Sequence, residues 1–241
     1  MKKSRPFQFK QFTIEQQASA MKVTLDACLF GAIVCHQRRL SPSDKALDIG
    51  TGTGLLALMM AQAGVEHIDA VEIDPAAAME ASNNVAQSPF ASAVNVHRED
   101  IDNFEAESLY DVVITNPPFF SNSLKGPNQQ RNQARHNDGL TFDRLCQKIR
   151  QLLAPSGEAW LLLPVDEMER LTAEAATKGL YPQAQWLLRS TESSVPYRSV
   201  VRFTLACQPK SVSTEHIIIR DRSGAYTQAF SKLLQPYYLK L

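Results

Sequence analysis

The sequence predicts an α/β fold in which helices cover both faces of a mostly parallel sheet. Two observations lead to this fold class. Short apolar runs at residues 46–49 and 68–73 are each followed by a segment of helical periodicity, at 55–62 and 76–85. A glycine-rich turn at 50–54 joins the first run to the first of these helices. Strands that alternate with helices are typical of parallel sheets, because the helix carries the chain back to the starting edge.

A further helix is expected before the first strand, over residues 24–39. Apolar residues recur there at helical spacing from Leu25 to Cys35, and the pattern stops before the Ser-Pro pair at 41–42.

The remaining elements are expected in chain order. Strands are predicted at 94–97, 110–115 and 159–163, helices at 142–153 and 166–178, a hairpin-type pair at 185–188 and 199–207, and an apolar run at 217–219 before a short helix that ends at Pro236. Neither repeats nor linker-like tracts interrupt the 241 residues, so one domain is expected. Its parts are an N-terminal arm and helix (1–40), a central core (45–165) and a C-terminal part with a basic tail (166–241).

Composition favours a cytoplasmic protein. No apolar stretch approaches the roughly 20 residues that a membrane-spanning helix needs. The four cysteines have neither zinc-ligand spacing nor a disulfide pattern, which favours free thiols in a reducing compartment and no metal site.

Charge is balanced overall but uneven along the chain. Residues 1–22 hold five Lys or Arg against one acid, and residues 187–241 hold eight against three, so the middle is acidic. Residues 121–136 add three basic side chains and no acid. These basic segments either surround a site for a polyanion or are scattered solvated charge, and the sequence leaves both readings open.

The glycine-rich turn carries the first candidate site. Residues 48–54 read Asp-Ile-Gly-Thr-Gly-Thr-Gly, so Gly50, Thr51, Gly52 and Gly54 follow Asp48 at a strand end and precede a helix. Dinucleotide sites use Gly-x-Gly-x-x-Gly, and the acid here would repel a pyrophosphate. Asp48 instead suits an ammonium group, and the glycines allow a ligand to approach the backbone closely.

Acids after the next two strands suit an adenosine. Glu72 ends the second strand and can accept hydrogen bonds from both ribose hydroxyls. Asp74 is expected to cap the following helix, which begins with Pro75. Asp100 can accept from an adenine amino group, and Ile101 can pack on the ring. A ligand with an amino acid at one end and adenosine at the other is S-adenosylmethionine, the predicted cofactor.

The tetrapeptide Asn116, Pro117, Pro118 and Phe119 follows the strand at 110–115. Two prolines hold the backbone extended and offer carbonyl acceptors without donors. An amino group on a planar base can donate both hydrogens to the Asn116 side chain and the Pro117 carbonyl while its ring stacks on Phe119. These residues are the predicted catalytic turn, with Asn116 also beside the cofactor.

Taken in order, these motifs resemble the class I methyltransferases that act on amino nitrogens, over about residues 45–165. The resemblance implies a Rossmann-like fold with a mostly parallel seven-stranded sheet, an antiparallel terminal strand and helices on both faces. Members modify adenine in DNA or RNA, guanine in ribosomal RNA, or glutamine in release factors. Phe119 stands where many members carry Tyr.

The flanks resemble a narrower family of bacterial tRNA methyltransferases. These segments are residues 8–12 (Gln-Phe-Lys-Gln-Phe), 21–27 (Met-Lys-Val-Thr-Leu-Asp-Ala) and 134–136 (Ala-Arg-His). The resemblance implies methylation of the exocyclic amine of an adenine in the anticodon loop of a valine tRNA. Alternatives are a ribosomal RNA base, a protein glutamine, or a catalytically silent cofactor-binding module.

Several roles stay open from sequence alone. His136 is a base, a phosphate contact or a surface residue. Phe7, Phe9 and Phe12 either grip RNA or dock the N-terminal arm on the core. A monomer is favoured, and no membrane contact is expected.

Overall fold

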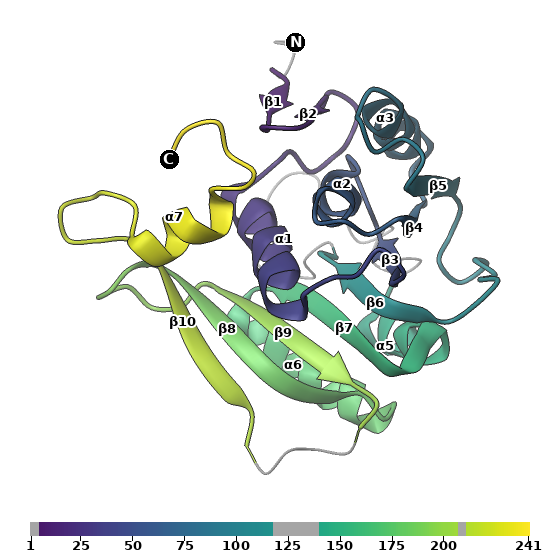
Figure 1. The fold of residues 1–241 in the computed structure, drawn as a ribbon. Helices are drawn as coiled ribbons and strands as arrows, with labels where there is room; N and C mark the ends of the chain where they lie inside the picture. Colours follow the sequence, from purple (N-terminus) through teal and green to yellow (C-terminus); the bar gives the residue numbers. More distant parts are fainter. Residues whose placement is uncertain (1–4, 118–139, 207–210) are drawn as a thin grey trace, which may run out of the picture.

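The computed structural model describes residues 5–117, 140–206 and 211–241, which form an eight-stranded sheet with helices on both faces (Figure 1). Pro118, Phe119, His136 and Cys207 lie outside the described residues. The sheet strands are β3 (Lys45–Ile49), β4 (His67–Glu72), β5 (Val94–Arg98), β6 (Tyr110–Thr115), β7 (Leu153–Leu163), β8 (Tyr181–Thr191), β9 (Arg198–Thr204) and β10 (Ser213–Arg220). The helices are α1 (Leu25–Arg38), α2 (Leu55–Gln62), α3 (Pro75–Ala86), α5 (Phe142–Leu152), α6 (Val165–Thr177) and α7 (Gln228–Leu234), and a small hairpin joins β1 (Phe7–Gln8) to β2 (Thr13–Ile14).

Two apolar cores lie on opposite faces of the sheet. Helices α1, α2 and α7 pack against one face, and α5 and α6 cover the other. Strand β6 shows why the sequence reads as a continuous apolar run, since Val112 and Ile114 enter the first core while Val113 enters the second. Burial on both faces therefore confirms the predicted α/β class.

Strand order places a crevice beside the predicted site. The order across the sheet is β10-β8-β9-β7-β6-β3-β4-β5, and β9 alone runs antiparallel to its neighbours β7 and β8. The chain proceeds outward from β3 through β4 to β5, and from β6 to β7 on the other side. The carboxyl ends of β3 and β6 therefore form the topological switch point, where open α/β sheets bind ligands.

The sheet has one strand more than predicted, because β10 pairs in parallel with β8. Residues 213–216 at its start are exposed, and only Ile217 and Ile219 are buried. An edge strand with so few buried side chains has a short apolar run, which is why the sequence suggested only residues 217–219.

The predicted helix boundaries have clear local causes. The Thr24 hydroxyl accepts from the Ala27 amide and caps α1, and Asp74 caps α3 through the Ala76 amide with Pro75 in the first turn, as expected. Helix α1 ends where Arg39 adopts a left-handed conformation with φ of 50°. Across the described residues, no helix combines the length and apolar character that crossing a bilayer requires.

The N-terminal arm docks on the core through its aromatic residues. Phe9 and Phe12 are buried and their rings stack at 4.6 Å between centroids. Phe7 packs against Phe9 and Tyr238, and the Lys10 amide donates to the Tyr237 carbonyl at 2.8 Å. The docking reading of these aromatics is therefore correct for Phe9 and Phe12, whose rings are not available to stack on RNA.

The basic tail is partly neutralised by acids. Arg198 pairs with Asp26 on α1 at 3.3 Å, and Arg222 pairs with Glu192 at 3.1 Å. Cys28, Cys35 and Cys146 are free thiols, as expected. Burial raises the pKa of the Cys35 thiol to about 11, so it is unreactive at neutral pH.

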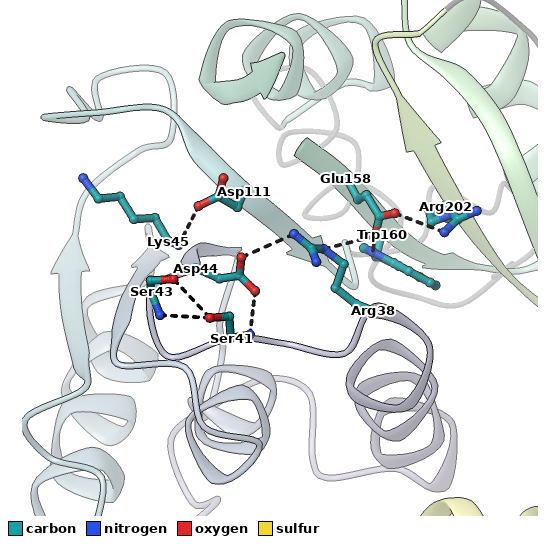
Figure 2. A network of polar contacts seen from close by, with 9 residues as sticks. All are labelled: Arg38, Ser41, Ser43, Asp44, Lys45, Asp111, Glu158, Trp160 and Arg202. Carbon is teal, nitrogen blue, oxygen red and sulfur yellow. Dashed lines mark hydrogen bonds and ion pairs between the residues drawn. The ribbon is translucent and has the colours of Figure 1, made fainter. Parts of the chain in front are cut away.

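A polar network joins α1 to the sheet at the edge away from the switch point (Figure 2). The Arg38 guanidinium lies 3.3 Å from Asp44 and 3.4 Å from Glu158. Glu158 also accepts from Arg202 at 3.0 Å and from the Trp160 indole at 3.3 Å. One carboxylate thus accepts hydrogen bonds from β7 and β9 and forms an ion pair with α1.

Replacing Glu158 tests this network. Glu158→Ala should lower the free energy of unfolding by about 1–3 kcal/mol, because two partly buried guanidinium groups and an indole lose their shared acceptor. Urea denaturation measures the change. The matched control is Glu192→Ala, whose pair with Arg222 is 64% and 90% exposed on its two side chains. A change beyond about 0.5 kcal/mol in the control, or none in Glu158→Ala, would contradict the assignment.

Candidate functional site

The glycine turn needs its glycines for backbone conformation. Gly50, Gly52 and Gly54 have φ of 70°, 58° and 82°, all in the left-handed region. A side chain at Gly50 or Gly52 would meet no atom within 4 Å, so conformation and not space demands glycine there. The amides of Gly50 and Thr51 donate to the Val71 carbonyl at 2.8 and 3.1 Å, which ties the turn to β4.

Asp48 places a buried carboxylate under this turn. Its side chain is 0% exposed, and Oδ2 accepts from the Thr51 hydroxyl at 2.6 Å and the Ala57 amide at 3.2 Å. Oδ1 has no hydrogen-bond partner within the described part of the chain. Burial, opposed by these two hydrogen bonds and reinforced by the nearby Glu72 charge, raises the pKa of Asp48 to about 7. A buried acceptor without a partner fits an ammonium group supplied by a ligand.

Glu72 fastens the turn to the end of β4. Its Oε2 accepts from the Gly52 amide and its Oε1 from the Asp74 amide, both at 2.9 Å. Each carboxylate oxygen keeps a second lone pair, so both can still accept from a diol. The geometry is therefore compatible with the predicted ribose contact.

Ile73 is not among the site residues predicted from the sequence. It directly follows Glu72 and is 63% exposed, an unusual exposure for a large aliphatic side chain. It lies beside Glu72, the acid predicted to bind the ribose, and presents an apolar surface there. The sequence placed Ile73 in the apolar run 68–73, whereas β4 ends at Glu72 and leaves Ile73 exposed.

Asp100 and Ile101 lie in the turn after β5. Asp100 Oδ1 accepts from the Asp102 amide at 3.0 Å, and Oδ2 lies 3.8 Å from the Arg144 guanidinium. Ile101 is buried in the core beneath the sheet with Ile49. Asp100 thus has an acceptor oxygen near the surface, whereas the Ile101 side chain is buried in the core.

Asn116 lies next to the glycine turn through strand pairing. Thr115 is the register partner of Ile49, and its hydroxyl donates to the Ile49 carbonyl at 2.8 Å. The next residues are Asn116 and Gly50, so the two motifs meet at the switch point. Asn116 Oδ1 is a buried acceptor without a partner among the described residues, and Pro117 beside it is buried. The rest of the predicted turn, Pro118 and Phe119, is outside the described residues.

The site therefore contains two acceptors that lack partners among the described residues, Asp48 Oδ1 and Asn116 Oδ1, together with the glycine turn and Glu72. Among the residues that the structure describes, no group of His, Cys, Asp and Glu is arranged to hold a metal ion. These acceptor groups suit an organic ligand that brings its own hydrogen-bond donors.

Comparisons define the class of protein. The model of the methyltransferase small domain family matches residues 32–167, more than half of the chain. The fold resembles a predicted O-methyltransferase from Agrobacterium tumefaciens, with TM-score 0.63, 17% identity and coverage of 88% of this chain and 96% of that one. It also resembles the glycopeptide N-methyltransferase MtfA solved with S-adenosyl-L-methionine, with TM-score 0.57, 14% identity and coverage of 74% and 94%. The fold is that of a class I methyltransferase.

Full-length relatives give the particular family. Proteins named tRNA1(Val) (adenine(37)-N6)-methyltransferase from Dyadobacter fermentans and Bacteroides fragilis are 40% and 38% identical, over 100% and 99% of this chain and 100% of each relative. The relative of that name from Shewanella loihica is 37% identical over 98% of this chain and 100% of its own length. The chain belongs to the family that these methyltransferases form.

The buried charge of Asp48 predicts how stability depends on pH. A carboxyl with a raised pKa in the folded state is harder to ionise there, so stability is lost as pH rises from its ordinary value of 3.8 to about 7. Asp48→Asn removes that cost. The free energy of unfolding of the variant, relative to the parent, should rise by about 2–3 kcal/mol between about pH 5 and pH 8. Urea denaturation across that range measures it, and a difference that does not change with pH would contradict the buried-charge assignment.

Proposed function

We propose that this chain transfers the methyl group of S-adenosylmethionine to the exocyclic 6-amino group of adenine 37 in the anticodon loop of valine tRNA. The observation that carries the proposal is the buried side-chain oxygen of Asn116 at the switch point, beside the glycine turn, which has no partner in the part of the chain that the structure describes. Full-length similarity to relatives with that name supports the choice of tRNA and base.

The cofactor contacts follow from the donors and acceptors that the residues present. S-adenosylmethionine supplies a methyl group on a sulfonium centre. Asp48 binds the ammonium group, and the glycine turn of Gly50, Thr51, Gly52 and Gly54 lets the ligand approach the backbone. Glu72 accepts from the ribose hydroxyls, and Asp100 accepts from the adenine amino group while Ile101 supports the ring from the core.

Asn116 activates and aligns the target amine. Its Oδ1 and the Pro117 carbonyl accept the two hydrogens, which favours a pyramidal nitrogen with a localised lone pair. The same dipoles stabilise the positive charge that develops on nitrogen during direct displacement. Holding both reactants in line can supply about 7–11 kcal/mol of the barrier. No strong base is needed, since the methylated ammonium is acidic. Phe119, which lies outside the described residues with Pro118, supplies by its residue type an aromatic face, and stacking of a base on such a face contributes about 1–3 kcal/mol.

The target adenine of the tRNA must leave the stack of neighbouring bases, and the free-energy cost of this step is lowest in a loop. Arg198 and Arg222 pair with acids, so the charges of these two residues of the basic tail are compensated within the fold. We place recognition of the anticodon loop around the switch point, with the enzyme acting in the cytoplasm as a monomer and as a single domain.

Methyl-transfer assays test the substrate. Labelled S-adenosylmethionine is offered with unmodified tRNA, ribosomal RNA and release factor in parallel, and nuclease digestion with mass spectrometry maps the product. The expected product is N6-methyladenosine at position 37 of valine tRNA. Label in release factor alone would instead support a glutamine methyltransferase, and label in no substrate would support a silent cofactor-binding protein.

The roles of Asn116 and Glu72 predict opposite kinetic effects. Asn116→Ala should lower kcat about 10²–10³-fold and leave cofactor affinity nearly intact, because its acceptor acts mainly in the transition state. Glu72→Ala should instead raise the Kd for the cofactor, because it loses the ribose contact and its bond to the Gly52 amide. Isothermal titration and saturation kinetics separate the two. A large loss of affinity with normal kcat in Asn116→Ala would show that Asn116 is wrongly placed.

A further inference from the structure

The chain between β2 and α1 runs out to α3 and returns (Figure 1). We name residues 15–23 of this segment the strap. Three consecutive strap amides donate to one carboxylate on α3, that of Glu80. The Ala18 amide lies 2.8 Å from Oε1, the Ser19 amide lies 2.8 Å from Oε2, and the Gln17 amide also donates to Oε1. Glu80 is only 8% exposed, so this is a buried charge held almost entirely by strap backbone.

One helical turn further along α3, Asn84 joins the strap to the glycine turn. Its Oδ1 accepts from the Glu15 amide, and its Nδ2 donates to the Glu15 carbonyl and the Thr53 carbonyl, all at 2.9 Å. Thr53 lies between two glycines of the cofactor turn. Asn84 is 1% exposed, so one buried amide holds both segments in a fixed relation.

The strap is also closed upon itself. Gln16 accepts from the Val23 amide at 2.8 Å and donates to the Arg5 carbonyl at 2.9 Å. The Lys22 ammonium donates to the Ser19 carbonyl at 2.8 Å. The bonds of Gln16 to Val23 and of Lys22 to Ser19 shape the strap internally, so the contacts with α3 are the ones that join it to the glycine turn.

The same helix lies beside the turn. A Cβ atom added at Gly54 would be in ordinary van der Waals contact with Ala81, at 3.6 Å from its backbone. Ala81 stands between Glu80 and Asn84, and α3 starts three residues after Glu72. The strap and the glycine turn are therefore both anchored on α3, and Glu72 ends the strand that precedes this helix.

We propose that Glu80 and Asn84 are positioning residues that hold the strap as a wall of the cofactor site, so that both set cofactor affinity without touching the cofactor. The inference rests on the proposed function, because it concerns the same site. Backbone hydrogen bonding supports it, since burial acts to raise the pKa of Glu80 but the bonds from Ala18, Ser19 and Gln17 together lower it. We name the hydrogen bonds of Glu80 and Asn84 to the strap the latch. The Glu80 carboxylate therefore stays ionised at neutral pH and keeps its part of the latch.

Substitution of Glu80 should lower the fraction of molecules in which the strap is in the position that allows cofactor binding. If the strap is placed in only a fraction of molecules, the apparent Kd rises by the inverse of that fraction. Glu80→Ala, which removes three acceptor contacts, should raise the Kd for S-adenosylmethionine about tenfold or more. The kcat at saturating cofactor should stay near that of the parent. Glu80→Gln keeps one acceptor oxygen and should give a smaller increase.

Asn84→Ala tests the second half of the latch. Its effect on the Kd should be non-additive with that of Glu80→Ala, because both residues hold the same segment. The matched control is Asp44→Ala. Asp44 accepts from the Ser41 amide at 2.7 Å and pairs with Arg38 (Figure 2), but it precedes β3 at the opposite edge of the sheet. It should lower stability and leave the Kd unchanged.

The measurements are isothermal titration with S-adenosylmethionine, hydrogen exchange of amides 17–19, and thermal unfolding of each full-length variant. The inference requires faster exchange and a raised Kd in Glu80→Ala while Asp44→Ala keeps the parental Kd. A folded Glu80→Ala with the parental Kd, or an equal rise in Kd in Asp44→Ala, would overturn it. If Glu80→Ala fails to fold, the same criteria apply to Glu80→Gln. A parent chain that binds no S-adenosylmethionine would overturn the proposed function instead.

Discussion

The parallel pairing of β3 with β6 is the constraint on which the site depends. Thr115 lies opposite Ile49, and a hydroxyl-to-carbonyl bond of 2.8 Å holds their ends together. Asn116 and Gly50 are the next residues on the two strands, so the acceptor turn and the glycine turn meet because this register is kept. A slip by one residue would turn every side chain of β6 to the other face and exchange the contents of the two cores. The register is therefore specified by packing, and the register in turn fixes the position of the Asn116 turn relative to the glycine turn.

Much of this arrangement could be predicted because it is local or periodic. Strands buried on both faces give apolar runs, and the order of Asp48, Glu72, Asp100 and Asn116 along the chain follows from strand ends that share one edge. Strand β10 was less visible, since half of it is exposed. The strap latch could not be predicted at all. Glu80 reads as an ordinary solvated helix acid, and only the three-dimensional fold shows that it is buried by amides about 60 positions earlier.

Charge along the chain was ambiguous for the same reason. Basic residues of the C-terminal part lie opposite acids from the middle: Arg198 faces Asp26, and Arg202 faces Glu158. These pairs cross between α1, β7 and β9, so they connect the added C-terminal strands to the core. Composition alone counts such residues as a basic surface, although their charges are compensated within the fold. Affinity for a polyanion therefore depends on which cations remain without an acid, a property of the fold and not of the charge count.

Helix α3 holds the glycine turn and the strap in a fixed relation, which the strand ends alone would not do. The Glu72 carboxylate just before α3 accepts from the Gly52 amide, and on α3 itself Asn84 donates to the Thr53 carbonyl and Glu80 accepts from the strap amides. A helix with intact backbone bonds moves as a rigid body, so the contacts of Asn84 and Glu80 cannot shift independently. Buried polar contacts are a costly way to join segments, because a buried carboxylate must recover its lost hydration from every donor around it. They do, however, fix direction and distance in a way that apolar packing does not. The glycine turn and the strap are thus held at a separation that is set by a single element, α3.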